Sequence, residues 1–239
     1  MVNGTTEVRE IPLVLEPRDV WAALGNPDRV LPALSPDIEE SIAVARELCE
    51  PRGLYRRLTV DEVGRRGITF KDGPPLEGKF LAHCFEGAEE AIFVLLTIGP
   101  ALEKRVSQMF ADGDTVEAFI LDAVGSASAM NLLTTVLGEI SEESKERDSN
   151  VGTCLSPGQS YWDVTGQGHM FEVLHGEMIG VELLESSFLR PQKSQSALVP
   201  IGPNLKVLSD PADSFCRYCP ATNCPVRKEP QIVTEVEVG

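Results

Sequence analysis

The chain has little positive charge for its size. Its 239 residues include 21 Lys and Arg against 37 Asp and Glu, which gives a formal net charge of −16 and a pI near 4.6. An acidic surface repels phosphate backbones and anionic lipid headgroups, so we expect neither a nucleic-acid-binding protein nor a membrane-surface protein. A small ligand or a basic protein partner is compatible with this charge.

Several signatures of enzymes and of export are missing from the sequence. We find no nucleophile elbow, phosphate-binding loop or dinucleotide fingerprint, and no clear strand precedes "GQGHMF" as such a fingerprint requires. No apolar run is expected to reach the length of a membrane span, and the opening "MVNGTTEVREIPLVLEP" lacks the basic start and long apolar stretch of a signal peptide. We therefore expect a cytoplasmic protein, in which thiols stay reduced.

What the chain does have is a hydrophobic content of 42%, enough for one substantial domain. Hydrophobic periodicity and end signals predict helices and strands that do not alternate regularly, which favours an α+β fold. Ser35 is predicted to cap one helix, and Asp114 with Glu117 to form a capping box on the longest one. The predicted helices are 16–25, 35–50, 100–113, 114–147 and 169–180, and the predicted strands are 8–16, 53–63, 67–70 and 91–99. We expect a main domain over residues 1–209 and a cysteine-rich tail over 210–239.

Two polar stretches are candidates for a ligand site. In "CLSPGQ", residues 154–159, Pro157 and Gly158 predict a tight turn where a ligand can approach the backbone closely. Most loops of this kind are simply turns. In "ESSFLRPQKSQSAL", residues 185–198, charged and hydroxyl side chains gather, and the alternative is a solvated strand face.

These two stretches also carry a family resemblance. "CLSPGQSYWDVTGQGHMFEVLHGEMIGVELLESSFLRPQKSQSALVPIGP" resembles the activation domain of cobalamin-dependent methionine synthase in its Pro-Gly loop, its helix and its Glu-Ser, Pro and Ser-x-Ser pattern. The segments "PRGLYRRL", "LLTIGPALEKRV" and "GDTVEAFILDAVGSASAMNLL" are similar to stand-alone versions of that domain. The resemblance covers roughly residues 10 to 205.

The resemblance implies a fold, an activity and a site. Domains of this family have a bent antiparallel sheet flanked by helices, bind S-adenosylmethionine and dock on the cobalamin domain, where they support reductive methylation of cobalt that has become Co(II). The implied pocket lies between the 154–159 loop and the 185–196 strand. Its expected residues are Ser156, Pro157, Gly158, Gln159, Glu185 and Lys193.

The ligand loop also departs from the family pattern, which reads Arg-x-x-x-Gly-Tyr. Cys154 stands at the Arg position and Gln159 at the Tyr position, while Gly158 is kept. A guanidinium group can donate two parallel hydrogen bonds to a carboxylate, and a thiol cannot. We therefore expect weak binding of S-adenosylmethionine. Arg190 or Lys193 is a candidate replacement for the lost cation.

The tail "FCRYCPATNCPVR" holds Cys216, Cys219 and Cys224 among only six cysteines in the chain. Thiolates suit zinc and iron–sulfur clusters, and three thiols this close in a reduced compartment predict one metal centre. Buried thiols with a chance third are the alternative. The irregular spacing favours a [4Fe–4S] cluster, while zinc stays open. Candidates for the fourth ligand are Cys154, which we prefer, and Cys49, Cys84, His83, His169 and His175.

Together these observations predict an accessory protein that docks on a corrinoid-bearing methyltransferase and helps to reactivate its cobalt, with an iron–sulfur centre as electron carrier. The alternative is a non-catalytic binding or scaffold protein of the same fold with structural zinc in its tail.

Overall fold

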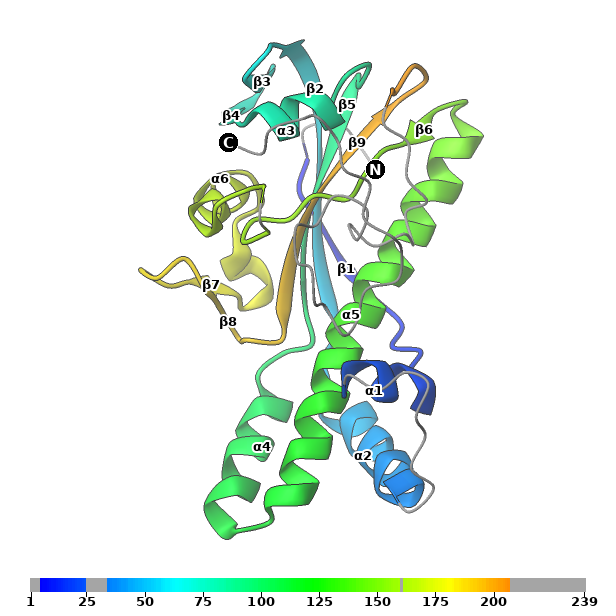
Figure 1. Cartoon of the computed structure of the whole chain (residues 1–239), viewed down its shortest axis with the longest axis vertical. Coiled ribbons are helices and arrows are strands. Elements are labelled where there is room, and N and C mark those ends of the chain that lie inside the picture. The colour runs from blue at the N-terminus through cyan, green and yellow to red at the C-terminus, as the bar shows by residue number, and fades with distance from the viewer. Residues whose placement is uncertain (1–4, 25–33, 160, 207–239) are drawn as a thin grey trace.

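The computed structural model describes residues 5–24, 34–159 and 161–206, and they form one antiparallel sheet covered on both faces (Figure 1). The strand order is β4-β3-β2-β5-β9-β6, and β1 also pairs with β2. All of these pairs are antiparallel, and helices pack on the sheet, which confirms the predicted α+β class with an antiparallel sheet flanked by helices.

Three long strands form the middle of the sheet. β5 (Glu90–Thr97) is buried on both faces and lies between β2 (Arg52–Val63) and β9 (Ser194–Gly202). β2 is long enough to pair with β1 (Glu7–Glu10) near its start and with β3 (Gly67–Phe70) near its end. The remaining strands of the sheet are β4 (Gly73–Glu77) and β6 (Asn150–Val151).

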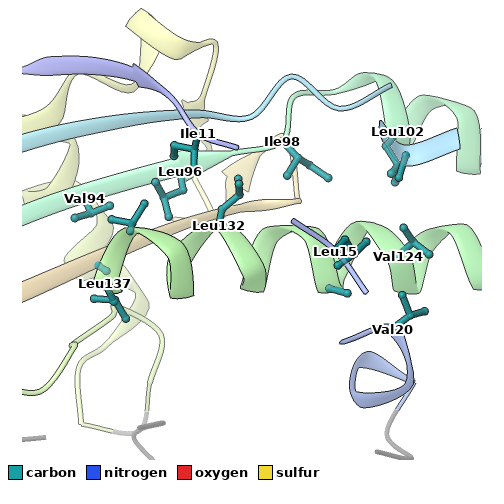
Figure 2. Packing of buried hydrophobic residues seen from close by; sticks show 14 of the residues in the cluster. Ile11, Leu15, Val20, Val94, Leu96, Ile98, Leu102, Val124, Leu132 and Leu137 are labelled. Atoms are coloured by element: carbon teal, nitrogen blue, oxygen red, sulfur yellow. The ribbon is translucent and has the colours of Figure 1, made fainter. Parts of the chain in front are cut away.

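One face of the sheet, the helix-covered face, packs against one long helix, on which three other helices pack. The longest, α5 (Thr115–Glu146), runs along the strands, and Figure 2 shows Leu132 and Leu137 beside Val94 and Leu96 of β5. The other three gather around α5, mainly in the lower part of Figure 1. They are α1 (Pro17–Ala23), α2 (Ser35–Leu48) and α4 (Ala101–Asp112).

The opposite face, the loop-covered face, is covered by shorter pieces of chain. They enclose a second core around Phe93, Leu95 and Leu198, which alternate in sequence with the side chains of the first core. These pieces are α3 (Lys79–Cys84), η2 (Val164–Gly166), α6 (Gln167–Leu174), η3 (Gly176–Ile179) and the hairpin of β7 (Glu182–Leu183) with β8 (Leu189–Arg190).

One expectation about apolar runs needs correction. We expected no segment of membrane-spanning length, yet α5 is long and apolar enough to pass that test. Most of the apolar window is buried inside the protein, because α5 packs against the sheet and against α1, α2 and α4. By this arrangement α5 is the core helix of the fold.

Local sequence signals predict most of the helices and strands correctly, but not all of their ends. Ser35 does not cap α2, because Leu34 is the N-cap residue and Ser35 lies inside the helix. Asp114 is the N-cap of α5 as predicted, but its side chain makes no capping hydrogen bond. The first strand ends at Glu10 rather than at residue 16, and the stretch "GPPLE" forms β4, which the sequence did not predict.

Candidate ligand site

The segment that follows α5 runs beside β9 and is fixed to it by backbone hydrogen bonds. After β6, the amide of Gly152 donates to the carbonyl of Pro200 at 2.9 Å. Leu155 and Leu198 then exchange two hydrogen bonds of 2.9 and 2.7 Å. The predicted ligand loop therefore starts from a position set by the sheet.

The Pro-Gly turn itself is closed by its own hydrogen bonds. The amide of Gly158 donates to the carbonyl of Trp162 at 2.8 Å, and the amide of Ser156 donates to the hydroxyl of Tyr161 at 3.0 Å. Gly158 has a φ of 88°, a left-handed conformation that favours glycine. Because these two amides are used within the turn, the loop does not present them as an anion-binding nest.

The two residues that lead into the turn point to different cores. Leu155 is fully buried in the core of the loop-covered face, whereas Cys154 packs against the core of the helix-covered face. Burial raises the pKa of the Cys154 thiol to about 12, so the thiol is neutral at physiological pH. A metal at this position would have to displace that proton.

Lys193 also lies on the helix-covered side. Its Nζ is 2.9 Å from Oδ1 of Asp122 and 2.8 Å from Oγ of Ser126, both in α5. The amino group is therefore already paired with a carboxylate. This ion pair takes Lys193 away from the turn formed by Ser156, Pro157, Gly158 and Gln159.

The other charged candidates lie in or beside the β7–β8 hairpin, at the surface. Glu185 is exposed in its turn, and exposed Arg190 lies 3.8 Å from Glu182. Within the described parts of the chain, no hydrogen bond or ion pair links Glu185 or Lys193 to residues 156–159. The structure thus gathers Ser156 to Gln159 into one turn and leaves the charged candidates elsewhere.

A row of polar side chains lies beneath α6, on the loop-covered face. Ser196 donates from its hydroxyl to Oε1 of Gln167 at 2.9 Å, and both side chains are buried. Next to it, Ser194 donates to Oγ1 of Thr97 at 2.9 Å. Ser194 and Ser196 share a face because side chains alternate along β9. These hydroxyls and the Gln167 amide form a polar row on this face, in which Ser196 and Gln167 satisfy each other.

Gln167 and Thr97 were not predicted from the sequence as members of this row. Only part of the arrangement is visible in the sequence. The Ser-x-Ser spacing predicts two hydroxyls on one face, but pairing Thr97 with Ser194 requires the strand register, and Gln167 reaches Ser196 only after α6 folds over the sheet.

A third missed residue is Arg56, a cation on the same face. Its Nη1 donates to the carbonyl of Val173 at 3.1 Å, near the C-terminal end of α6. A cation is favourable there because helix carbonyls leave partial negative charge at that end. Arg56 therefore holds α6 against β2.

Cys216, Cys219 and Cys224 lie outside the described residues, as does the proposed domain boundary at 209 and 210. Within the described residues, no three metal-ligating side chains gather. Burial raises the pKa of Cys49 to about 11 and of Cys84 to about 12.

The histidine candidates for a fourth ligand are dispersed. His83 Nδ1 is 3.1 Å from Glu86, and His175 Nδ1 is 3.7 Å from Glu177. Nδ1 of His169 is buried without a hydrogen-bond partner among the described residues. None of the three lies in a cluster of metal ligands within the described part of the chain.

Comparison with known proteins identifies the architecture. No protein-family model matches the chain, and no curated protein matches it. Among solved structures, it is similar to the MetH reactivation domain bound to AdoHcy, with a TM-score of 0.65 and 14% sequence identity over 87% of this chain and 82% of that one. The protein therefore has the fold of the MetH reactivation domain.

Proposed function

We propose that the protein is an accessory reactivation factor for a corrinoid-dependent methyltransferase, methionine synthase or a relative. It docks on the cobalamin-bearing partner in the cytoplasm and helps to return Co(II) to a state that accepts a methyl group. The observation that carries this proposal is the likeness to the MetH reactivation domain over 87% of the chain, together with the motifs of residues 154–203.

The arrangement of those motifs supports the proposal. The Pro-Gly turn, α6 and β9 follow one another in the resemblance, and in the structure the segment of the turn and α6 pack on the face of the sheet to which β9 contributes Ser194, Ser196 and Leu198. Ser194, Ser196 and Gln167 supply polar groups there. The buried side chains around Phe93 form the apolar core of the same face. We propose this face as the site of a ligand related to the AdoHcy of the neighbour.

S-adenosylmethionine itself is expected to bind weakly. Cys154 offers no charge, Lys193 is paired with Asp122, and Arg190 lies exposed in the β7–β8 hairpin beside Glu182, so neither candidate cation lies at the Pro-Gly turn to meet the ligand's carboxylate. Loss of one charged contact weakens binding by about 1.5–3 kcal/mol, or roughly ten- to a hundredfold. Calorimetry should find a dissociation constant well above micromolar, and tight micromolar binding would contradict this reading.

An iron–sulfur cluster is proposed in the tail, held by Cys216, Cys219 and Cys224, with Cys154 as the fourth ligand. When bound, such a cluster supplies single electrons. Cys216→Ser or Cys219→Ser should abolish the metal content of anaerobically purified protein, and Cys154→Ser should lower it. Full content in Cys216→Ser would remove the tail from the site, and full content in Cys154→Ser would remove that residue alone.

Docking is tested by mixing the protein with purified corrinoid proteins in their cob(II)alamin form. The acidic surface predicts a complex whose affinity falls as salt is raised. We expect the visible cob(II)alamin spectrum of one partner to change on mixing, and the change to be smaller in high salt. Unchanged spectra for every corrinoid methyltransferase of the source organism would contradict the proposal.

A scaffold without redox chemistry is the second candidate. It is favoured by one observation, namely that the turn amides and Lys193 are already paired within the protein. Metal and sulfide analysis of protein purified without oxygen separates the two candidates. Iron with sulfide supports the reactivation factor, and zinc supports the scaffold.

A further inference from the structure

A hollow of about 650 Å³ lies on the outer side of α3, away from the ligand site. Its volume is within the range of small-molecule pockets. The hollow is formed by the turn that joins β2 to β3 and by one side of α3. Its lining residues are Gly64, Arg65, Arg66, Lys79, Ala82, His83 and Glu86.

The lining carries concentrated positive charge in an acidic protein. Arg65, Arg66 and Lys79 form no ion pair with any residue that the structure describes. The one carboxylate, Glu86, is already engaged, because Lys206 lies 2.7 Å from it and His83 lies 3.1 Å from it. These hydrogen bonds, that of Lys206 first, lower the pKa of Glu86. The hollow therefore keeps three uncompensated cations among the described residues.

A backbone hydrogen bond links the β2–β3 turn, which carries Arg65 and Arg66, to the start of α3, which carries Lys79. The amide of Gly78 donates to the carbonyl of Arg66 at 2.8 Å, which joins the turn to the residue just before Lys79. Across the turn, Gly64 donates to Gly67 at 2.9 Å. Helical spacing puts Lys79 and His83 on one side of α3, while Phe80 and Leu81 enter the core, and Glu86, just after the helix, contacts His83.

We propose that this hollow binds a small molecule through a phosphate or pyrophosphate group. Arginine suits this role because its planar fork donates two parallel hydrogen bonds to phosphate oxygens. The overall charge of −16 opposes diffuse attraction of anions, so binding must come from the local cluster. The described lining contains no Phe, Tyr or Trp, and His83 is already engaged with Glu86, so recognition is expected to rest on the cations. This site is independent of the reactivation role.

The test is calorimetric titration of the full chain with inorganic pyrophosphate at constant ionic strength. Wild type is compared with R65Q/R66Q and with K104Q/R105Q. The second variant removes the same charge from exposed positions on α4, at the other end of the molecule (Figure 1). Circular dichroism and thermal melting confirm that both variants are folded.

We expect saturable binding by wild type, weakening of at least about tenfold in R65Q/R66Q, and a change of less than about twofold in K104Q/R105Q. Equal weakening in both variants would show that only net charge matters and would overturn the proposal. It is also overturned if wild type shows no saturable binding, or if R65Q/R66Q binds as wild type does.

Discussion

The two faces of the sheet are built from the same three central strands but are covered in different ways. On the helix-covered face, four helices bury mainly aliphatic side chains, and the charges that enter are paired, as in Arg57 with Glu90 and Glu143. On the loop-covered face, short helices, a hairpin and the Pro-Gly turn leave a row of hydroxyl and amide groups against the sheet. The comparison teaches that helices bury one face with aliphatic side chains, whereas short elements and loops bring polar side chains against the other, the face that we propose as the ligand site.

The first test of this comparison is the reactivity of Cys154, which lies at the border between the two faces. Burial raises the pKa of the Cys154 thiol, so its thiolate fraction near pH 8 is expected to be well below that of the unfolded chain. In metal-free, reduced protein, iodoacetamide should therefore alkylate Cys154 more than about tenfold more slowly than in denatured protein. Peptide mass spectrometry resolves the site, and equal rates would place Cys154 outside the core.

The second test removes the charge network from the helix-covered face. Arg57 lies 2.6 Å from Glu90 and 2.7 Å from Glu143, and only 2% of its side chain is exposed. Arg57→Ala should lower the free energy of unfolding by about 3 kcal/mol, because two carboxylates lose their shared cation. The control is Arg52→Ala, whose exposed pair with Glu50 is worth less than about 1 kcal/mol. Urea unfolding measures both variants, and similar losses would contradict the network's role.

The same network predicts a pH dependence. Burial opposes ionisation of Glu90, but hydrogen bonds from Arg147 and Arg57 hold the pKa of Glu90 below its usual 4.5. A lowered carboxyl pKa contributes stability above the unfolded value, and that stability is lost as pH falls through the folded value. The difference in stability between wild type and Arg57→Ala should therefore be constant near neutrality and shrink below pH 4.5. A difference that grows in acid would contradict the assignment.

The third test concerns close packing on the loop-covered face. A Cβ added to Gly166 would clash with the indole ring of Trp162, whereas one added to Gly168 would meet nothing within 4 Å. Gly166→Ala should cost about 1–3 kcal/mol from overpacking, while Gly168→Ala in α6 should be neutral or stabilising by up to about 1 kcal/mol. Thermal unfolding distinguishes them. Equal effects would mean that Trp162 does not pack on the Gly166 backbone.

The smallest expected effect is in the polar row. Ser196→Ala removes the buried hydrogen bond to Gln167 and should cost about 1 kcal/mol. Ser107→Ala removes an exposed hydroxyl on α4 and should change stability by less than about 0.5 kcal/mol. If Ser196→Ala is as stable as wild type, the row is not a structural element of this face.

The sequence predicts the long elements, such as β5 and α5, better than the short ones. The apolar run of β5 and the long pattern of α5 are local signals, and both elements were found close to their observed bounds. β4 was missed because Pro74 and Pro75 argue against a strand. It forms at the edge of the sheet, where a missing amide costs no ladder hydrogen bond.

The candidate site was harder to predict because its parts come from distant segments. The Ser-x-Ser pattern and the Pro-Gly turn are visible locally, but contacts such as Gln167 with Ser196 depend on how α6 folds over β9. Lys193 was expected beside the turn, and its pairing with Asp122 depends on α5 lying against the opposite face. Charge alone cannot predict which face a residue at the start of a strand will occupy.

The central claim is that this protein reactivates a corrinoid methyltransferase. The most direct measurement follows recovery of turnover by such an enzyme after its cobalt has been converted to Co(II), with a one-electron reductant and S-adenosylmethionine supplied. We predict that turnover of the cognate enzyme returns only when this protein is present, and that recovery is slower at high salt. Recovery that is the same with and without the protein, for every corrinoid methyltransferase of the source organism, would contradict the claim.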